Sequence, residues 1–288
     1  MGAFSIERFE ADCRQNGTRY WYAHEFMRSL GYDTWTSFQK VITKAMGSCA
    51  MLGIDPTEAF APATYLEVGK SEKTYKLTRF ACFLVSMHAD ANKPEVAKAK
   101  AALAAIAAQL VEQQIAESDL GRLETREDLK AAERQMSGVA KTAGLEGAQY
   151  AFFKDAGFRG MYNMSLRDLM SKKGVDPNKT LYDFMGLEEM AGNLFRVTQT
   201  TAKVRSGDLK GARTLEATAK GVGREVRNMM VKNSGIAPEN LPIAENIVKV
   251  KGRLKSANRA MKKLDRQIKR LTEEAASTTT DDIEELED

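Results

Sequence analysis

The chain has 288 residues, of which 43% are hydrophobic and 28% are charged, a balance typical of globular proteins with apolar cores. This composition excludes a wholly disordered chain, and a total of six prolines excludes a collagen-like or proline-rich scaffold. The formal net charge is only +4, so the distribution of charge along the chain says more about function than its total does.

The cysteines and the apolar runs indicate the compartment. Cys13, Cys49 and Cys82 are odd in number and widely spaced, which argues against a disulfide framework and favours a reducing compartment. The first dozen residues carry acids and no apolar run, so no signal peptide is predicted. The longest apolar run, 101–108, is far shorter than the ~20 residues of a membrane span. We expect a soluble, cytoplasmic protein with no membrane partner.

Residues 1–110 combine strand and helix signals, which predicts a small α+β domain. Aromatic, β-prone residues come first, and amphipathic helix patterns and a polar hairpin turn follow them. The predicted elements are, in chain order, a strand at 19–23, helices at 24–32 and 35–53, a hairpin at 63–77 with Gly69 in its turn, and a buried helix at 78–89.

Helical segments follow this domain. Pro94 fits the first turn of a helix, where a missing N–H costs nothing, and apolar residues then recur at spacings of three and four. Residues 111–137 are highly charged and helix-prone, and we expect them to form a connector. Residues 138–242 contain helix patterns interrupted by Gly and Pro with no strand alternation, which predicts a mainly helical domain whose methionines fill its core.

From residue 243 the apolar pattern becomes strictly periodic. Apolar residues recur at alternating spacings of four and three, which predicts a long helix that packs in coiled-coil fashion. This seam consists of Ile243, Ile247, Val250, Leu254, Ala257, Met261, Leu264, Ile268 and Leu271. The seam packs either on another helix of the chain or on its twin in a homodimer, which we favour. The residues expected to hold the homodimer together are Ile247, Val250, Leu254, Met261, Leu264, Ile268 and Leu271.

The same segment divides sharply by charge. Residues 241–272 have a net charge of +8, with every basic residue outside the seam, and residues 273–288 have a net charge of −8. We expect a basic heptad helix at 243–272 and an acidic, disordered tail at 273–288. The tail either only keeps the chain soluble or competes with a nucleic acid for the basic helix.

The sequence shows little that predicts catalysis. HExxH, CxxC, GxGxxG and Walker-type phosphate-loop motifs are absent, and His24 and His88 stand in no known catalytic spacing. The glycine-rich phrase KGVGR at 220–224 lies in a helical context without the preceding strand that a phosphate loop needs. Cys82 has apolar neighbours, as an inert core thiol does. We therefore expect no enzyme, no cofactor and no metal site.

Signals for nucleic-acid binding are stronger. Aromatic residues of the first domain alternate with Lys and Arg, and unpaired bases stack on rings while cations neutralise phosphates. Many of these aromatics also stand at spacings typical of core residues, so a purely structural role remains open for them. The residues expected to bind DNA are Arg19, Lys40, Lys44, Lys70, Lys73, Lys76, Arg79, Arg259, Lys262, Lys263, Arg266, Lys269 and Arg270.

Several long phrases resemble known families. WYAHEFMRSLGYDTWTSFQKVITKA, YKLTRFACFLV and NKPEVAKAKAALA resemble the BRO-N domain, a DNA-binding module of phage and viral proteins. GFRGMYNMSLRDLMSKKGV, FMGLEEMAGNLFRVTQTTAK, VGREVR and PENLP resemble the C-terminal half of the DNA-damage-inducible protein D (DinD) family. Together the two resemblances cover roughly residues 15–245. They imply a bacterial DNA-damage-response protein linked to RecA, whereas phage relatives with BRO-N domains act as antirepressor-like regulators.

These observations favour one function and leave two others open. The leading hypothesis is a non-enzymatic protein of the DNA-damage (SOS) response that prefers single-stranded DNA and modulates filaments of a RecA-type recombinase. The first alternative is a transcriptional regulator of a prophage or mobile element that acts on duplex DNA or on a repressor protein. The second is a metal-dependent nuclease.

Overall fold

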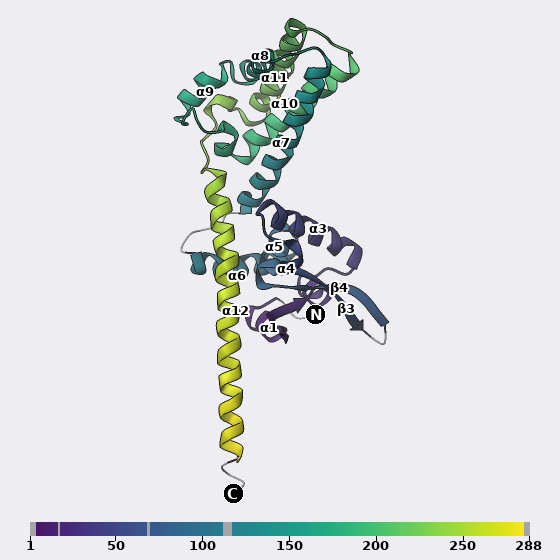
Figure 1. Cartoon of the computed structure of the whole chain (residues 1–288), viewed down its shortest axis with the longest axis vertical. Coiled ribbons are helices and arrows are strands. Elements are labelled where there is room, and N and C mark those ends of the chain that lie inside the picture. Colours follow the sequence, from purple (N-terminus) through teal and green to yellow (C-terminus); the bar gives the residue numbers. More distant parts are fainter. Residues whose placement is uncertain (1–3, 17, 68–69, 112–116, 285–288) are drawn as a thin grey trace. The chain divides into compact units, whose positions relative to one another are not determined.

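A computed structural model of the chain describes residues 4–16, 18–67, 70–111 and 117–284 (Figure 1). It describes no side chain at 66, 67, 70, 110, 111, 117 or 272–284. The chain divides into two compact units, unit 1 with residues 1–117 and 251–288, and unit 2 with residues 118–250. Within the described ranges, no helix is both long enough and apolar enough to cross a membrane.

Unit 1 is built around a four-stranded antiparallel sheet. Its strands are β1 (Arg14–Asn16), β2 (Thr18–Tyr22), β3 (Phe60–Glu67) and β4 (Lys70–Leu77), in the order β1-β2-β4-β3. Leu77 pairs with both Trp21 and Phe60 across the sheet, and all three side chains are buried. Because side chains alternate between the two faces of a strand, this row forms the core side of the sheet. The predicted strand at 19–23 and the predicted hairpin are confirmed, and the turn at Gly69 lies outside the described residues.

Helices cover this sheet. They are α1 (Ile6–Ala11), α2 (Ala23–Ser29), α3 (Trp35–Met51), α4 (Pro56–Ala59), α5 (Arg79–His88) and α6 (Pro94–Val111). The hydroxyl of Thr78 accepts a hydrogen bond from the Ala81 amide and so caps the start of α5. Every residue from Arg79 to Met87 is buried, as the apolar sequence of this helix predicts. Cys82 is among them, and burial raises the pKa of its thiol well above the usual value, which suits an inert core residue.

The C-terminal helix α12 (Ile247–Glu284) follows the heptad pattern but uses its seam within the chain. Ile247 and Val250 are buried in unit 2, and Leu254, Ala257 and Met261 are buried in unit 1. The first half of the seam, which we expected to meet a second copy, is therefore covered by the same chain. Its last residue, Leu271, is 65% exposed. The backbone stays helical to Glu284, so most of the expected disordered tail continues this helix.

Unit 2 is helical throughout its described residues, apart from one isolated bridge between Met185 and Ile243. Its elements are α7 (Glu117–Thr142), α8 (Gln149–Tyr162), α9 (Leu166–Lys172), the 3-10 turn η1 (Leu181–Phe184), α10 (Leu187–Ser206), α11 (Ala212–Ser234) and the 3-10 turn η2 (Pro238–Asn240). Leu120, Leu123, Leu129 and Met136 of α7 are buried. The residues from 117 to 137, which we expected to be a connector, are therefore a core helix of this unit.

Glycines set the closest helix contact in unit 2. A Cβ atom added to Gly160 of α8 would lie only 2.2 Å from the carbonyl oxygen of Lys220, and one added to Gly223 of α11 would lie 2.5 Å from the carbonyl oxygen of Gly157. Only hydrogen fits at these positions, because backbone meets backbone there. The phrase KGVGR is thus a helix-crossing motif and not a phosphate loop, as its helical context predicts.

This crossing gives a prediction with an internal control. Gly223→Ala forces α8 and α11 apart and should destabilise unit 2 by about 1–3 kcal/mol, the usual cost of overpacking. A Cβ atom at Gly221, two residues earlier on the same helix, meets nothing within 4 Å. Gly221→Ala should therefore stabilise the unit by up to about 1 kcal/mol through helix propensity. Thermal unfolding followed by circular dichroism measures both, and equal effects of the two changes would contradict the crossing.

Candidate nucleic-acid interface

Arg79, one of the expected DNA-binding residues, is part of the core. Its side chain is only 1% exposed, and its guanidinium group forms ion pairs with Glu10 of α1 and with Asp265 of α12. The Nη2 atom lies 3.0 Å from one Glu10 oxygen and 2.8 Å from an Asp265 oxygen. The group also lies over the ring of Trp21, 5.1 Å from its centroid. The prediction for Arg79 is wrong, because two carboxylates already satisfy a cation that no phosphate can reach.

Two other expected DNA-binding cations also form ion pairs in unit 1, one largely buried and one at the surface. Arg19 is 11% exposed and donates hydrogen bonds to Glu10 at 3.0 Å and to the Cys13 sulfur at 3.1 Å. Lys262 of α12 pairs with Glu58 of α4 at 2.8 Å. These contacts orient α1, α4 and α12 against the core. We therefore remove Arg19 from the interface. Lys262 remains an expected DNA-binding residue, because its pair with Glu58 lies at the surface, with side chains 36% and 60% exposed.

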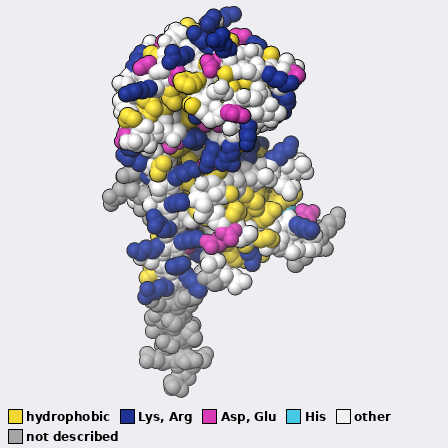
Figure 2. All heavy atoms as spheres, turned by 45° about the horizontal axis from the view of Figure 1, so that its top comes forward, with side chains coloured by type: hydrophobic (Ala, Val, Ile, Leu, Met, Phe, Trp, Pro, Cys, Tyr) yellow, Lys and Arg dark blue, Asp and Glu magenta, His cyan; other side chains and the backbone are white. Residues whose placement is uncertain are grey.

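Lys249 and Lys255 are exposed on α12, and four further exposed cations form a stripe along its middle. They are Arg259, Lys263, Arg266 and Arg270, all of them exposed. Their spacing of four, three and four residues places them on one side of the helix, opposite the buried Leu254, Ala257 and Met261. We call this set the α12 stripe. Figure 2 shows Lys and Arg side chains spaced along the described part of this helix.

The α12 stripe is electrostatically costly in the free protein. Like charges four residues apart on a helix repel by a few tenths of a kcal/mol, as Arg259 and Lys263 do, and Arg266 and Arg270 do the same. An anionic partner removes this repulsion, and α12 advances about 16 Å between the first and the last cation of the stripe. The face is therefore suited to a linear polyanion.

A second basic region lies elsewhere in unit 1. Lys40 and Lys44 are exposed one turn apart on α3, and Lys73 is exposed on β4. Lys73 borders a groove of about 510 Å³ that is also lined by Trp35, Gln39 and Tyr75. Figure 1 shows α3 and the β3–β4 hairpin on one side of unit 1 and α12 on the other. The expected DNA-binding residues thus occupy two separate regions, and the side chain of Lys70 is outside those described.

Most aromatic rings of the first domain already have partners. His24 stacks on Trp35, with ring centroids 3.9 Å apart, and on Tyr65, with centroids 5.5 Å apart. Half-buried Lys76 lies over the ring of Tyr20, and Arg28 lies over that of Tyr65. These cations occupy ring faces that bases would need. The alternation of aromatic and basic residues therefore partly reflects packing, which was the structural alternative for this pattern.

The other expected residues of α12 have mixed surroundings. Lys269 is half-buried, and so are Leu264 and Ile268 of the seam. Ile247, Val250, Leu254 and Met261 are buried within the chain, so they are not available to a second copy in this arrangement. Only the two ends of the seam are exposed, Ile243 at 49% and Leu271 at 65%. A homodimer through this seam remains a prediction.

Comparisons with known proteins bear on both units. A sequence model described as "DinD C-terminal domain" matches residues 116–250, which include the whole of unit 2. The chain is also 30% identical over 249 residues to "DNA damage-inducible protein D" of Escherichia coli (strain K12), a match that covers 81% of this chain and 90% of the relative. The chain belongs to the DNA damage-inducible protein D family. The BRO-N resemblance of residues 1–110 stays a prediction.

The DinD C-terminal domain contains a buried polar network that the sequence did not reveal. Glu189 pairs with Lys173 at 2.9 Å and accepts a hydrogen bond from the Tyr162 hydroxyl at 3.1 Å. Asn193 and Arg196 extend the network on the same helix, with Asn193 donating to the Tyr162 oxygen at 2.6 Å. Burial raises the pKa of Glu189, although Lys173 acts in the opposite direction. No local sequence pattern indicates these contacts, because the partners of Glu189 lie 16 and 27 residues away in the sequence.

This network holds the DinD C-terminal domain together and does not form an accessible site. Glu189, Asn193 and Arg196 are almost completely buried, so a substrate has no path to them. Within the described residues, no group of three or more His, Cys, Asp or Glu side chains is placed to hold a metal ion. The network instead fixes α10 against α8, α9 and η1 through hydrogen bonds that only one packing arrangement satisfies.

The Arg79 ion pairs give a stability prediction. Asp265→Ala leaves a buried guanidinium with one carboxylate fewer and should destabilise unit 1 by about 3 kcal/mol. Trp21 and Trp35 are the only tryptophans and both lie in unit 1, so urea unfolding followed by tryptophan fluorescence reports this unit. Lys98→Ala, which removes the exposed pair with Glu95 in the same unit, should change stability by less than about 0.5 kcal/mol. A similarly small effect at Asp265 would contradict the role of the ion pair.

His88 gives a pH prediction for the same unit. Burial, together with Lys44 and Lys100, lowers its pKa from 6.5 to about 4. Its Nε2 atom lies 2.7 Å from the Ser48 hydroxyl. Below pH 6.5 the unfolded chain binds a proton at His88, whereas the folded chain binds it only near pH 4. The free energy of unfolding therefore falls across this window as the pH falls.

The loss of stability from pH 7 to pH 5 should therefore be smaller in His88→Gln than in the native chain by about 2 kcal/mol. Glutamine keeps a hydrogen-bonding group beside Ser48, so the packing change is small. The same urea titrations measure the difference, and parallel losses in the two proteins would show that His88 is not the group responsible.

Proposed function

We propose that this chain is a DNA-damage-response protein that binds single-stranded DNA and carries out no catalysis. The α12 stripe is the observation that carries this proposal. Its four cations are exposed, share one side of a helix and have no acidic residue among them, whereas the seam on the opposite side holds the helix in unit 1. The name of the Escherichia coli relative, which describes it as inducible by DNA damage, supports the biological setting.

Single-stranded DNA suits the two basic regions of unit 1 better than a rigid duplex does. A flexible strand can follow the α12 stripe and also reach Lys40, Lys44 and Lys73 on the other side of the unit. The groove beside Lys73 offers Trp35 and Tyr75 next to cations, a combination that accommodates an unpaired base. Each region alone makes few phosphate contacts, so their joint use on one strand strengthens binding through effective concentration.

Binding of this kind has a direct consequence for recombinase filaments. A RecA-type recombinase assembles on the same single strands, so a protein that occupies them changes how much strand the recombinase can cover. We propose that this chain modulates such filaments by sharing their DNA. The link to a recombinase comes from the family resemblance, and the physical basis is a common polyanionic ligand.

Fluorescence anisotropy with a single-stranded oligonucleotide and with the corresponding duplex tests the proposal at several salt concentrations. The native chain should prefer the single strand with a steep salt dependence. Lys263→Gln/Arg266→Gln should weaken binding several-fold and lower the slope of log K against log salt by about 1.4, or about 0.7 for each lost phosphate contact.

The matched control is Arg134→Gln/Lys141→Gln, which removes the same charge from exposed positions of α7. It should leave the slope unchanged, because net charge alone does not make a phosphate contact. Equal effects of the two double variants would remove the α12 stripe from the interface. A clear preference for duplex DNA would instead favour the transcriptional regulator.

A further inference from the structure

The exposed side of α11 in unit 2 carries a second row of cations. Arg213, Lys220 and Arg224 are exposed, and their spacing of seven and four residues places them within about 40° of one another around the helix axis. Among the residues that the structure describes, none of the three forms an ion pair with a carboxylate. We call this set the α11 row.

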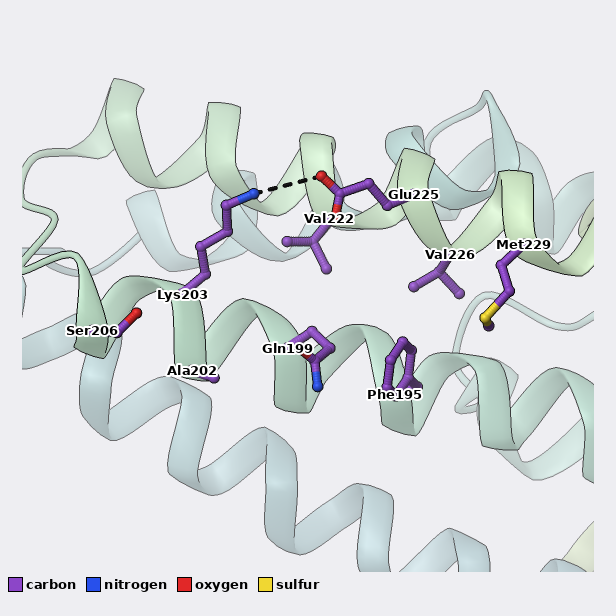
Figure 3. Close-up of a pocket in the computed structure, with 9 residues that line it drawn as sticks. All are labelled: Phe195, Gln199, Ala202, Lys203, Ser206, Val222, Glu225, Val226 and Met229. Atoms are coloured by element: carbon purple, nitrogen blue, oxygen red, sulfur yellow. Dashed lines mark ion pairs between the residues drawn. The ribbon is translucent and has the colours of Figure 1, made fainter.

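Two acidic residues near this row pair with other cations. Glu225 lies toward α10, where it pairs with Lys203 at 3.5 Å across a groove lined by Phe195, Val226 and other residues (Figure 3). Glu239 pairs with Arg227 at 2.8 Å. Both carboxylates are therefore paired with other cations. Glu216 lies on α11 between Arg213 and Lys220 and is half-buried, so three exposed cations face solvent against one carboxylate.

The packing of α11 on α8 gives this row a fixed position. The backbone of Lys220 and Arg224 contacts α8 directly at Gly160. The side chains of these two cations therefore extend from the part of α11 that packs on α8. Helices that meet through glycine backbones cannot rotate without a clash, so the Cα positions of the row are set before any ligand binds. Such preorganisation lowers the entropy lost on binding.

The neighbouring helix adds an aromatic ring. Phe152 of α8 is 64% exposed, the most exposed phenylalanine among the described residues. Because α8 packs against α11, the exposed ring and the row of cations belong to neighbouring helices. Single-stranded nucleic acid uses rings and cations together, with phosphates on the cations and a base on the ring. An acidic peptide would need the cations but not the ring.

We propose that the α8–α11 face of unit 2 is a second binding site for the sugar–phosphate backbone of single-stranded DNA. The cations Arg213, Lys220 and Arg224 contact phosphates, and Phe152 stacks on a base. The row covers about 16 Å of helix, the same length as the α12 stripe, which corresponds to about five nucleotides at 3.4 Å each. This inference rests on the proposed function and adds to it that one chain holds a strand at a site in each unit.

The test uses the full chain and fluorescein-labelled oligothymidylate of two lengths, one that fits a single site and one several times longer. The native chain should bind the long strand far more tightly than the short one, because the second contact becomes intramolecular. Lys220→Gln/Arg224→Gln should remove most of this advantage, weaken binding to the long strand about tenfold and lower its salt slope by about 1.4. Phe152→Ser should weaken binding without changing the slope, since it removes stacking and no charge.

Two controls keep the result specific. Lys220→Arg/Arg224→Lys keeps both charges and should bind like the native chain, whereas Arg134→Gln/Lys141→Gln loses two charges elsewhere in unit 2 and should also bind like it. The inference is overturned if Lys220→Gln/Arg224→Gln behaves like these controls while Lys263→Gln/Arg266→Gln still weakens binding. If the native chain binds no single strand at all, the proposed function itself fails. The inference is also overturned if Lys220→Gln/Arg224→Gln binds an acidic peptide more weakly than the native chain does but binds oligothymidylate equally well. That result would assign the face to a protein partner.

Discussion

The buried guanidinium of Arg79 is the interaction on which unit 1 depends. It joins Glu10 near the start of the chain to Asp265 near its end, across 255 residues of sequence, and it stacks on Trp21 of the sheet. Loss of either carboxylate would leave the buried charge of Arg79 incompletely compensated and would destabilise the unit. The same ion pairs therefore hold α1, α5 and α12 together. This contact, together with the burial of Leu254 and Met261, makes α12 a component of the first unit and not a free coiled-coil arm.

The ion pairs also sort the basic residues into two classes. Arg79 and Arg19 have carboxylate partners inside unit 1, where they position helices. The α12 stripe faces solvent and carries repulsion that an anion relieves. The same residue types therefore serve packing in one place and recognition in another, and only the presence of a carboxylate neighbour distinguishes them.

Unit 2 follows a comparable division. Gly157, Gly160 and Gly223 bring α8 and α11 into backbone contact, and the network around Glu189 and Arg196 holds α10 in place. This interior fixes the exposed α8–α11 face, so that its cations and Phe152 present a constant surface. In both units, rigid packing on one side of a helix gives a defined row of cations on the other, which is the arrangement that a strand with regular phosphates requires.

The sequence by itself determined the local elements and the periodicities. The strand at 19–23, the hairpin, the buried helix α5 and the heptad helix all follow from alternation, spacing and capping, which act over a few residues. It also showed that basic residues gather at 241–272. The tertiary structure alone decided which apolar seam meets which surface: the seam of α12 packs within its own chain, and the charged stretch expected to be a connector is the core helix α7. It also decided that Arg79 is structural while Arg266 is exposed, because a cation's role depends on carboxylates brought near it from distant parts of the chain, and no local pattern records that distance.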